Sequence, residues 1–152
     1  MSAALSSKSR GGRSRGGPRL VLQPPGRPTA RHSTRSVLKR FFAIAAAWEL
    51  SPLQQCRLLK IPSPQVLERY RLGQAPRLSA LQQERAALIS HIHRSLTRDA
   101  AGEERAWAFM HTPRAAKPFA GDSPLYFMLE NGLPALREVA RLLARAGRTP
   151  GV

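Results

Sequence analysis

Residues 51–73 read SPLQQCRLLKIPSPQVLERYRLG, and this pattern predicts two short helices joined by a turn. Ser51-Pro52 and Ser63-Pro64 are helix start signals of one kind, with serine as the N-cap and proline at the first helical position, where its missing N–H does no harm. Each signal begins a short helix, and Gly73 suits the position just after the second helix. Two short helices joined by a few residues are typical of a helix-turn-helix, although any small helical hairpin shares the pattern.

Longer amphipathic helices are expected on both sides of this pair. The first runs from Ser36 to near Leu50, and the second follows Ser79, which we expect to be its N-cap. The side chains expected to face the core are Val37, Leu38, Phe41, Phe42, Ile44, Ala45, Trp48, Leu53, Cys56, Leu58, Leu59, Val66, Leu67, Tyr70, Leu78, Leu81, Leu88, Ile89, Ile92 and Leu96.

Composition predicts an all-α fold. Of the 152 residues, 42% are hydrophobic but only 6% are aromatic, which suits a helical core better than a β-sandwich or barrel. The lone Cys56 excludes an internal disulfide and a thiolate zinc cluster, and a reducing compartment fits. The longest apolar run, 41–48, is too short to span a membrane, so we expect a soluble protein with no membrane partner.

Catalytic signals are missing from the sequence. It contains no Gly-rich phosphate loop, no Gly-x-Ser-x-Gly elbow and no nucleophile set beside a base. His91 and His93 are two positions apart, so they point to different faces of a helix and cannot chelate one metal ion. We therefore expect a protein that is not an enzyme and that has no catalytic residues, no metal and no cofactor.

Positive charge is concentrated at the N-terminal end. Residues 1–40 hold ten basic residues and no acidic one, which is most of the net charge of +16. Residues 1–33 are also rich in glycine, proline and serine, and we expect them to form a disordered arm. Three interpretations stay open: a tail that adds DNA affinity by neutralising phosphates, a transit peptide, against which the glycine and proline content argues, and an extension with no dedicated role, such as one produced by a start codon placed too early.

The helix pair suggests a set of DNA contacts. If the second short helix enters a major groove, Ser63 and Gln65 would face base edges, and Arg69 would lie one turn further along the same side. Glu68 favours the alternative that these are ordinary solvated side chains, because a carboxylate facing DNA weakens binding unless it accepts from cytosine. The flanking residues expected to contact phosphates are Arg57, Lys60, Arg71 and Arg77.

Residues 100–152 carry three further helix signals. The first helix begins with acidic residues, which suit the positive end of a helix dipole. The last begins at Pro134 and carries arginines spaced four apart, which either complement the helix dipole or form a surface for an anionic partner. The expected landmarks are Gly102-Glu103-Glu104, buried Trp107 and Met110, Thr112-Pro113, Ser123-Pro124, Asn131-Gly132, and the row Arg137, Arg141 and Arg145.

Part of this region resembles a known family. The string Trp107…Phe119-x-Gly121-x-Ser123-Pro124-Leu125…Met128-Leu129…Gly132-Leu133-Pro134…Val139…Leu142 is similar to the toxin-binding domain of the Xre/MbcA/ParS-like antitoxins. Upstream, Leu58-Leu59, Arg69-Tyr70-Arg71 and Gly73 resemble that family's Xre-type helix-turn-helix. The resemblance covers residues 36–147. Tyr70 stands where the family tends to have a tryptophan, and Lys60 where a turn glycine is common.

The resemblance implies a function and a division of the chain. Beyond the arm (1–33), which composition predicts, it implies a helix-turn-helix domain (34–99) and a toxin-binding domain (100–152) of a cytoplasmic bacterial antitoxin. Such a protein covers the active site of a cognate RES-domain toxin, an NAD-consuming enzyme, and represses its own operon as a homodimer on operator DNA. The toxin contacts expected here are Phe119, Gly121, Gly132, Arg137, Arg141, Arg145 and Arg148.

One alternative stays open, namely a stand-alone helix-turn-helix regulator whose C-terminal region only dimerises.

Overall fold

A computed structural model describes residues 30–98 and 102–147, and within these ranges the chain forms six helices and no strand. The predicted all-α fold is therefore confirmed. The basic arm up to residue 29, Arg148 and the expected domain boundary at residue 99 lie outside the described residues. In chain order the helices are α2 (Ala30–Ala47), α3 (Pro52–Leu59), α4 (Pro64–Arg71), α5 (Ala80–Leu96), α6 (Gly102–His111) and α7 (Pro124–Gly147).

The predicted N-caps are confirmed. The hydroxyls of Ser51, Ser63 and Ser79 each accept a hydrogen bond from the backbone N–H three residues later. In α3 and α5 the glutamine at that third position also accepts from the N-cap N–H, which completes a capping box. Local sequence therefore determines where these helices begin, before any tertiary contact is considered.

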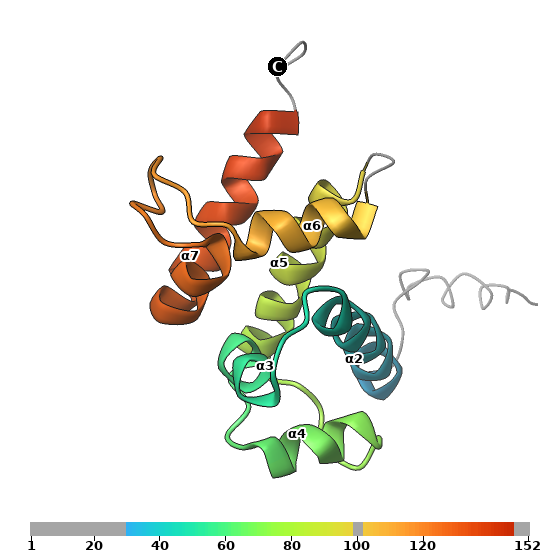
Figure 1. Cartoon of the computed structure of the whole chain (residues 1–152). Helices are drawn as coiled ribbons and strands as arrows, with labels where there is room; N and C mark the ends of the chain where they lie inside the picture. Colours follow the sequence, from blue (N-terminus) through green and yellow to red (C-terminus); the bar gives the residue numbers. More distant parts are fainter. Residues whose placement is uncertain (1–29, 99–101, 148–152) are drawn as a thin grey trace, which may run out of the picture.

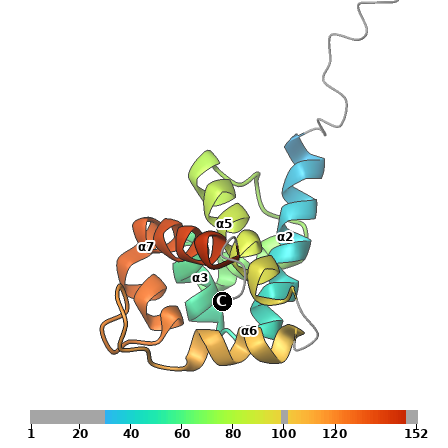
Figure 2. The ribbon, with the colours of Figure 1, turned by 90° about the horizontal axis from the view of Figure 1, so that it is seen from above.

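Helix α5 lies at the centre of the molecule (Figure 1). Figure 2, seen from above, shows α2 and α7 on opposite sides of α5, with α6 crossing below them. Side chains of all six helices contribute to one hydrophobic core, whose fully buried members include Phe41, Trp48, Leu58, Ile89, Met110 and Leu136. The helices on either side of residues 99–101 therefore share a single core.

Helix α7 is interrupted where the sequence predicted a break. Gly132 has φ 68° and ψ −145°, a conformation that residues with a side chain rarely adopt, and Pro134 follows it. The segment 124–131 and the longer segment that follows Gly132 are therefore two helical pieces that meet at an angle. Both pieces bury one face, the first through Leu125 and Met128.

Several predictions about boundaries and burial are wrong. The first helix spans Ala30–Ala47 rather than residues 36–50, so its first turn includes residues 30–33, which were assigned to the arm. Leu53 is exposed because it lies on the side of α3 opposite its buried residues, and Leu81 is exposed because the first turn of α5 extends beyond the core. Trp107 is 41% exposed, because only Ala106 and Met110 of α6 point fully inward.

No helix in the described part of the chain is both long enough and apolar enough to cross a bilayer.

Candidate nucleic-acid interface

The short helices α3 and α4 are joined by a tight turn. Lys60 caps α3 in the left-handed conformation (φ 57°), and Ile61, which is buried, anchors the turn to the core. Ser63 then caps α4, accepting from Val66 N at 3.3 Å. Lys60 therefore occupies a backbone conformation that glycine adopts without strain.

Helix α4 attaches to the core along one side only. Leu67 and Tyr70 are buried, and the opposite face carries Gln65, Glu68 and Arg69, all exposed. In Figure 1, α4 protrudes at the end of the molecule opposite the C-terminal end of α7, and none of the other described helices covers its outer face. An uncovered polar face on the second helix of such a pair has the form that reads a major groove.

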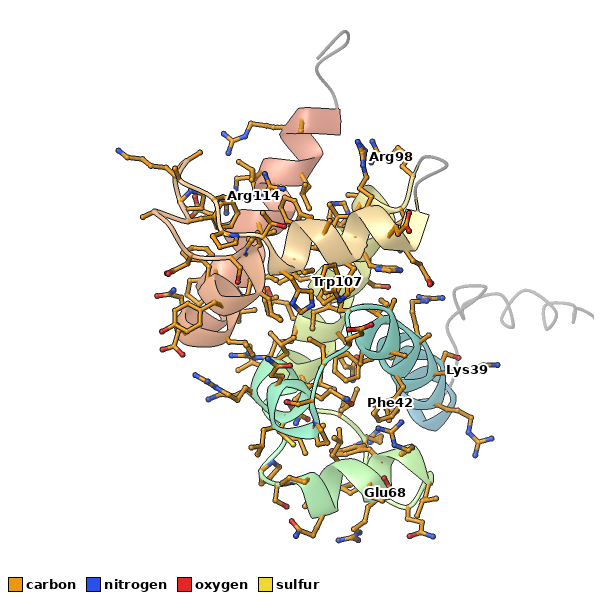
Figure 3. The ribbon with its side chains drawn as sticks, viewed as in Figure 1. Lys39, Phe42, Glu68, Arg98, Trp107 and Arg114 are labelled. Carbon is orange, nitrogen blue, oxygen red and sulfur yellow. The ribbon has the colours of Figure 1, made fainter. Side chains whose placement is uncertain are left out.

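A groove runs between α2 and the segment 70–77, beside the C-terminal end of α4. It has a volume of about 790 Å³. Its lining contains no aspartate or glutamate, whereas it contains four cations: Arg35, Lys39, Arg71 and Arg77. Figure 3 shows Phe42 on the side of α2 that faces α4 and Lys39 at the outer edge of α2. The structure therefore places a positively charged hollow next to the exposed face of α4.

Arg71 is held in place at this groove. Its guanidinium lies over the Phe42 ring, 4.3 Å from the ring centroid, and its Nε is 3.3 Å from Glu68 Oε1. Glu68, which the sequence suggested as unfavourable for DNA binding, is therefore partly neutralised by a neighbour one turn away on the same helix. Its carboxylate still lies on the exposed side of α4.

The residues predicted to contact DNA do not all lie on one surface. Gln65 and Arg69 share the exposed face of α4, Lys60 lies in the turn before it, and Arg71 and Arg77 lie at the groove. The Ser63 hydroxyl is half-buried and occupied as an N-cap.

Arg57 lies elsewhere. Its guanidinium donates to the Leu129 carbonyl at 3.1 Å and pairs with Glu130 at 3.2 Å, because α3 packs against α7 on that side. Its expected role as a phosphate contact therefore has no support from its position.

The residues predicted to contact the toxin also differ in their exposure and in their contacts. Phe119 is 3% exposed and packs edge-on against Phe109 and Phe127, so its ring belongs to the core and is not available to a partner in this conformation. Arg137 pairs with Glu84 of α5 at 2.8 Å. The two arginines that follow it in the row, Arg141 and Arg145, are exposed on α7.

The predicted glycines are explained by the backbone alone. Gly121 (φ 100°) and Gly132 (φ 68°) both adopt positive φ, which favours glycine whether or not a partner binds.

Sequence reasoning missed two features of this region. One is the pair Arg35 and Lys39, which lie four residues apart on α2 and so share a side of it; the predicted helix began one residue after Arg35, which hid this spacing.

The second feature is Arg85, which is buried and donates to the Leu58 carbonyl at 3.1 Å. Burial lowers the pKa of Arg85, and the neighbouring Glu84 carboxylate opposes that shift. No local pattern predicts a buried arginine on the core side of α5.

The chain matches no protein-family model, no curated protein and no solved structure with which it was compared. Among the described residues, no three histidine, cysteine, aspartate or glutamate side chains gather where they could hold a metal ion. Burial raises the pKa of the Cys56 thiol, which makes it a poor nucleophile at neutral pH. A proposal about function therefore depends on the surface around α4 and on the resemblance in the C-terminal helices.

Proposed function

We propose that this chain is a DNA-binding antitoxin that acts in the bacterial cytoplasm as a homodimer, by binding and not by catalysis. In this proposal α4 reads operator DNA, and the C-terminal helices bind a cognate RES-domain toxin and cover its active site. One observation carries the DNA-binding half: the uncovered face of α4 presents Gln65 and Arg69 next to a groove lined by four cations and no carboxylate. Glutamine and arginine are suited to adenine and guanine edges respectively.

Mobility shifts over a series of salt concentrations test the DNA-binding half. The full chain should bind the promoter fragment of its own operon more tightly than a random duplex of equal length, and both affinities should fall as salt rises. Equal binding to both duplexes would assign the interaction to charge alone. No shift even at low salt would refute DNA binding by this protein.

The toxin-binding half is supported by the resemblance over residues 107–142 and by the exposed arginines Arg141 and Arg145. Co-expression of the chain with the RES-domain protein encoded beside it should restore growth and NAD levels. The double variant R141A/R145A should restore them less well, while R40A/R94A, which removes the same charge from α2 and α5, should act like the wild type. Deleting residues 134–152 would be a poor test, because Leu136 and Val139 are in the core.

The stand-alone regulator is a second candidate, favoured by one observation. The helix-turn-helix and the C-terminal helices share a single core, so α6 and α7 have a structural role even without a toxin. Sequence-specific operator binding together with full failure of the wild-type chain to bind the neighbouring toxin would support this candidate and refute the antitoxin.

A further inference from the structure

The groove between α2 and the segment 70–77 holds more positive charge than the fold requires. Arg35, Lys39 and Arg77 form no ion pair with any residue that the structure describes, and of the four cations only Arg71 has a carboxylate partner. Like charges gathered in one hollow repel each other and destabilise the fold slightly. Their arrangement indicates an anionic occupant.

The second observation at this groove is a buried hydroxyl group. Thr34 lines it, is only 7% exposed, and its Oγ1 has no hydrogen-bond partner among the residues that the structure describes. Buried polar atoms are nearly always hydrogen-bonded, and an unpartnered one destabilises the fold. Because this oxygen is itself closed to solvent, a ligand oxygen in the groove would satisfy it only after the Thr34 side chain turns about its Cα–Cβ bond towards the groove.

Charge and position decide between possible occupants. The N-terminal arm of the chain is basic, so the groove would repel it. The groove is continuous with the C-terminal end of α4, because Tyr70, Arg71 and Leu72 belong to both. A DNA duplex lying along α4 would therefore pass a phosphodiester strand beside the groove.

We infer that this groove binds a phosphate of the DNA backbone, so that the interface extends from α4 onto α2. The inference rests on the DNA-binding half of the proposed function. In this arrangement Arg35 and Lys39 neutralise backbone phosphates, and the Thr34 hydroxyl, once its side chain turns towards the groove, donates to a phosphate oxygen. Arg71, the last residue of α4, lines the groove and is held over the Phe42 ring. These residues position the protein and carry no sequence preference.

The double variant R35Q/K39Q tests the groove directly. Both side chains are exposed, so the fold should be retained. Binding of the full chain to duplexes of operator and of arbitrary sequence should weaken by the same factor, and the slope of log affinity against log salt should become shallower by about two. The matched control R94Q/K117Q removes two exposed charges outside the groove and should leave the slope unchanged.

A second variant keeps the test independent of net charge. T34V preserves shape and removes only the hydroxyl, so DNA binding should weaken by between about 2-fold and 10-fold with no change in the salt slope. The unbound T34V protein should be at least as stable as the wild type, because the hydroxyl has no partner to lose. A less stable T34V protein would show that the hydroxyl serves the fold, and would overturn its assignment to a ligand.

The outcomes separate this inference from the proposed function. If the wild type binds DNA and R69A alters its sequence preference, while R35Q/K39Q leaves the salt slope unchanged, the groove does not contact phosphate and only the inference fails. If R35Q/K39Q changes the oligomeric state in size-exclusion chromatography but not the salt slope, the groove is a contact between copies of the chain. That result would also overturn the inference that the groove binds phosphate. If the wild type binds no DNA, both fail together.

Discussion

Trp48 Nε1 donates a hydrogen bond to His93 Nδ1 over 3.0 Å, and this bond joins the residue that follows α2 to the last turn of α5. Trp48 is fully buried, and on its other side His111 of α6 contacts its carbonyl oxygen at 2.7 Å. Nδ1 of His93 can accept only while it carries no proton, so the bond exists with the neutral ring. The contact between the end of α2 and α5 therefore depends on a histidine whose ring is neutral.

His93 should make the stability of the protein sensitive to acid. Burial lowers the pKa of His93 from its ordinary value of 6.5, and Glu103 on α6 opposes the shift only in part. The unfolded chain therefore binds a proton at a higher pH than the folded one. The free energy of unfolding should be fully retained above pH 6.5 and should decline as pH falls below it, through the lowered pKa of the folded state.

Urea denaturation at a series of pH values checks this prediction. In H93Q the glutamine carbonyl can accept from Trp48 without titrating, so the decline between neutral and mildly acidic pH should be smaller than in the wild type. H91Q removes an exposed histidine two residues away and should retain the wild-type decline. A decline of equal size in H93Q and the wild type would assign the effect to other groups.

Replacing Arg85 should lower the stability of the protein more than replacing an exposed arginine of the same helix. Replacement by methionine keeps the buried length but removes the donor to the Leu58 carbonyl near the end of α3. We expect R85M to lower the free energy of unfolding by about 1–3 kcal/mol. R94M, at an exposed position of the same helix, should change it by less than about 0.5 kcal/mol. Equal effects in the two variants would show that the bond to Leu58 contributes little.

Arg69 should contribute to sequence preference rather than to general affinity. If it contacts a base edge, R69A should weaken operator binding by about 1–3 kcal/mol and relax discrimination at one or two base pairs. Competition binding against single-base-pair variants of the operator measures both effects. An equal loss on operator and random DNA would make Arg69 a phosphate contact, as we infer for Arg35 and Lys39.

Gly132 should tolerate no side chain, for reasons of the backbone alone. A Cβ built there would lie 3.6 Å from Arg85 Nη2, an ordinary contact, so the obstacle is the φ of 68° and ψ of −145°. G132A should lower the free energy of unfolding by about 1–3 kcal/mol. A120G, which places glycine at an exposed alanine with φ 49°, should be neutral or stabilising. Thermal unfolding should show a lower midpoint temperature for G132A, and an unchanged or higher one for A120G, than for the wild type.

The helix starts and the break in α7 could be predicted because their causes lie within a few residues of each. The serine caps at residues 51, 63 and 79 and the break at Gly132 depend on hydrogen bonds and backbone angles within a few residues. Burial at the edges of the core could not be predicted in the same way. Leu81 and Trp107 have apolar side chains at positions consistent with a helical stripe, but both lie at the edge of the core. Leu81 is 60% exposed, and Trp107 is covered only in part, by its stacking on His111 and its hydrogen bond to Glu49.

The helical class, the helix starts and the turn chemistry follow from the amino-acid sequence, because caps, prolines and glycines act locally. Which charged residues surround α4 depends instead on how the helices pack. Arg57 is three positions from Lys60 in the chain, yet it binds Leu129, 72 residues away, because α3 packs against α7 on that side. Arg35 and Lys39 lie beside Arg71 and Arg77, because α2 crosses the end of α4. The surroundings of a charged side chain depend on which distant helix faces it, and sequence spacing does not contain that information.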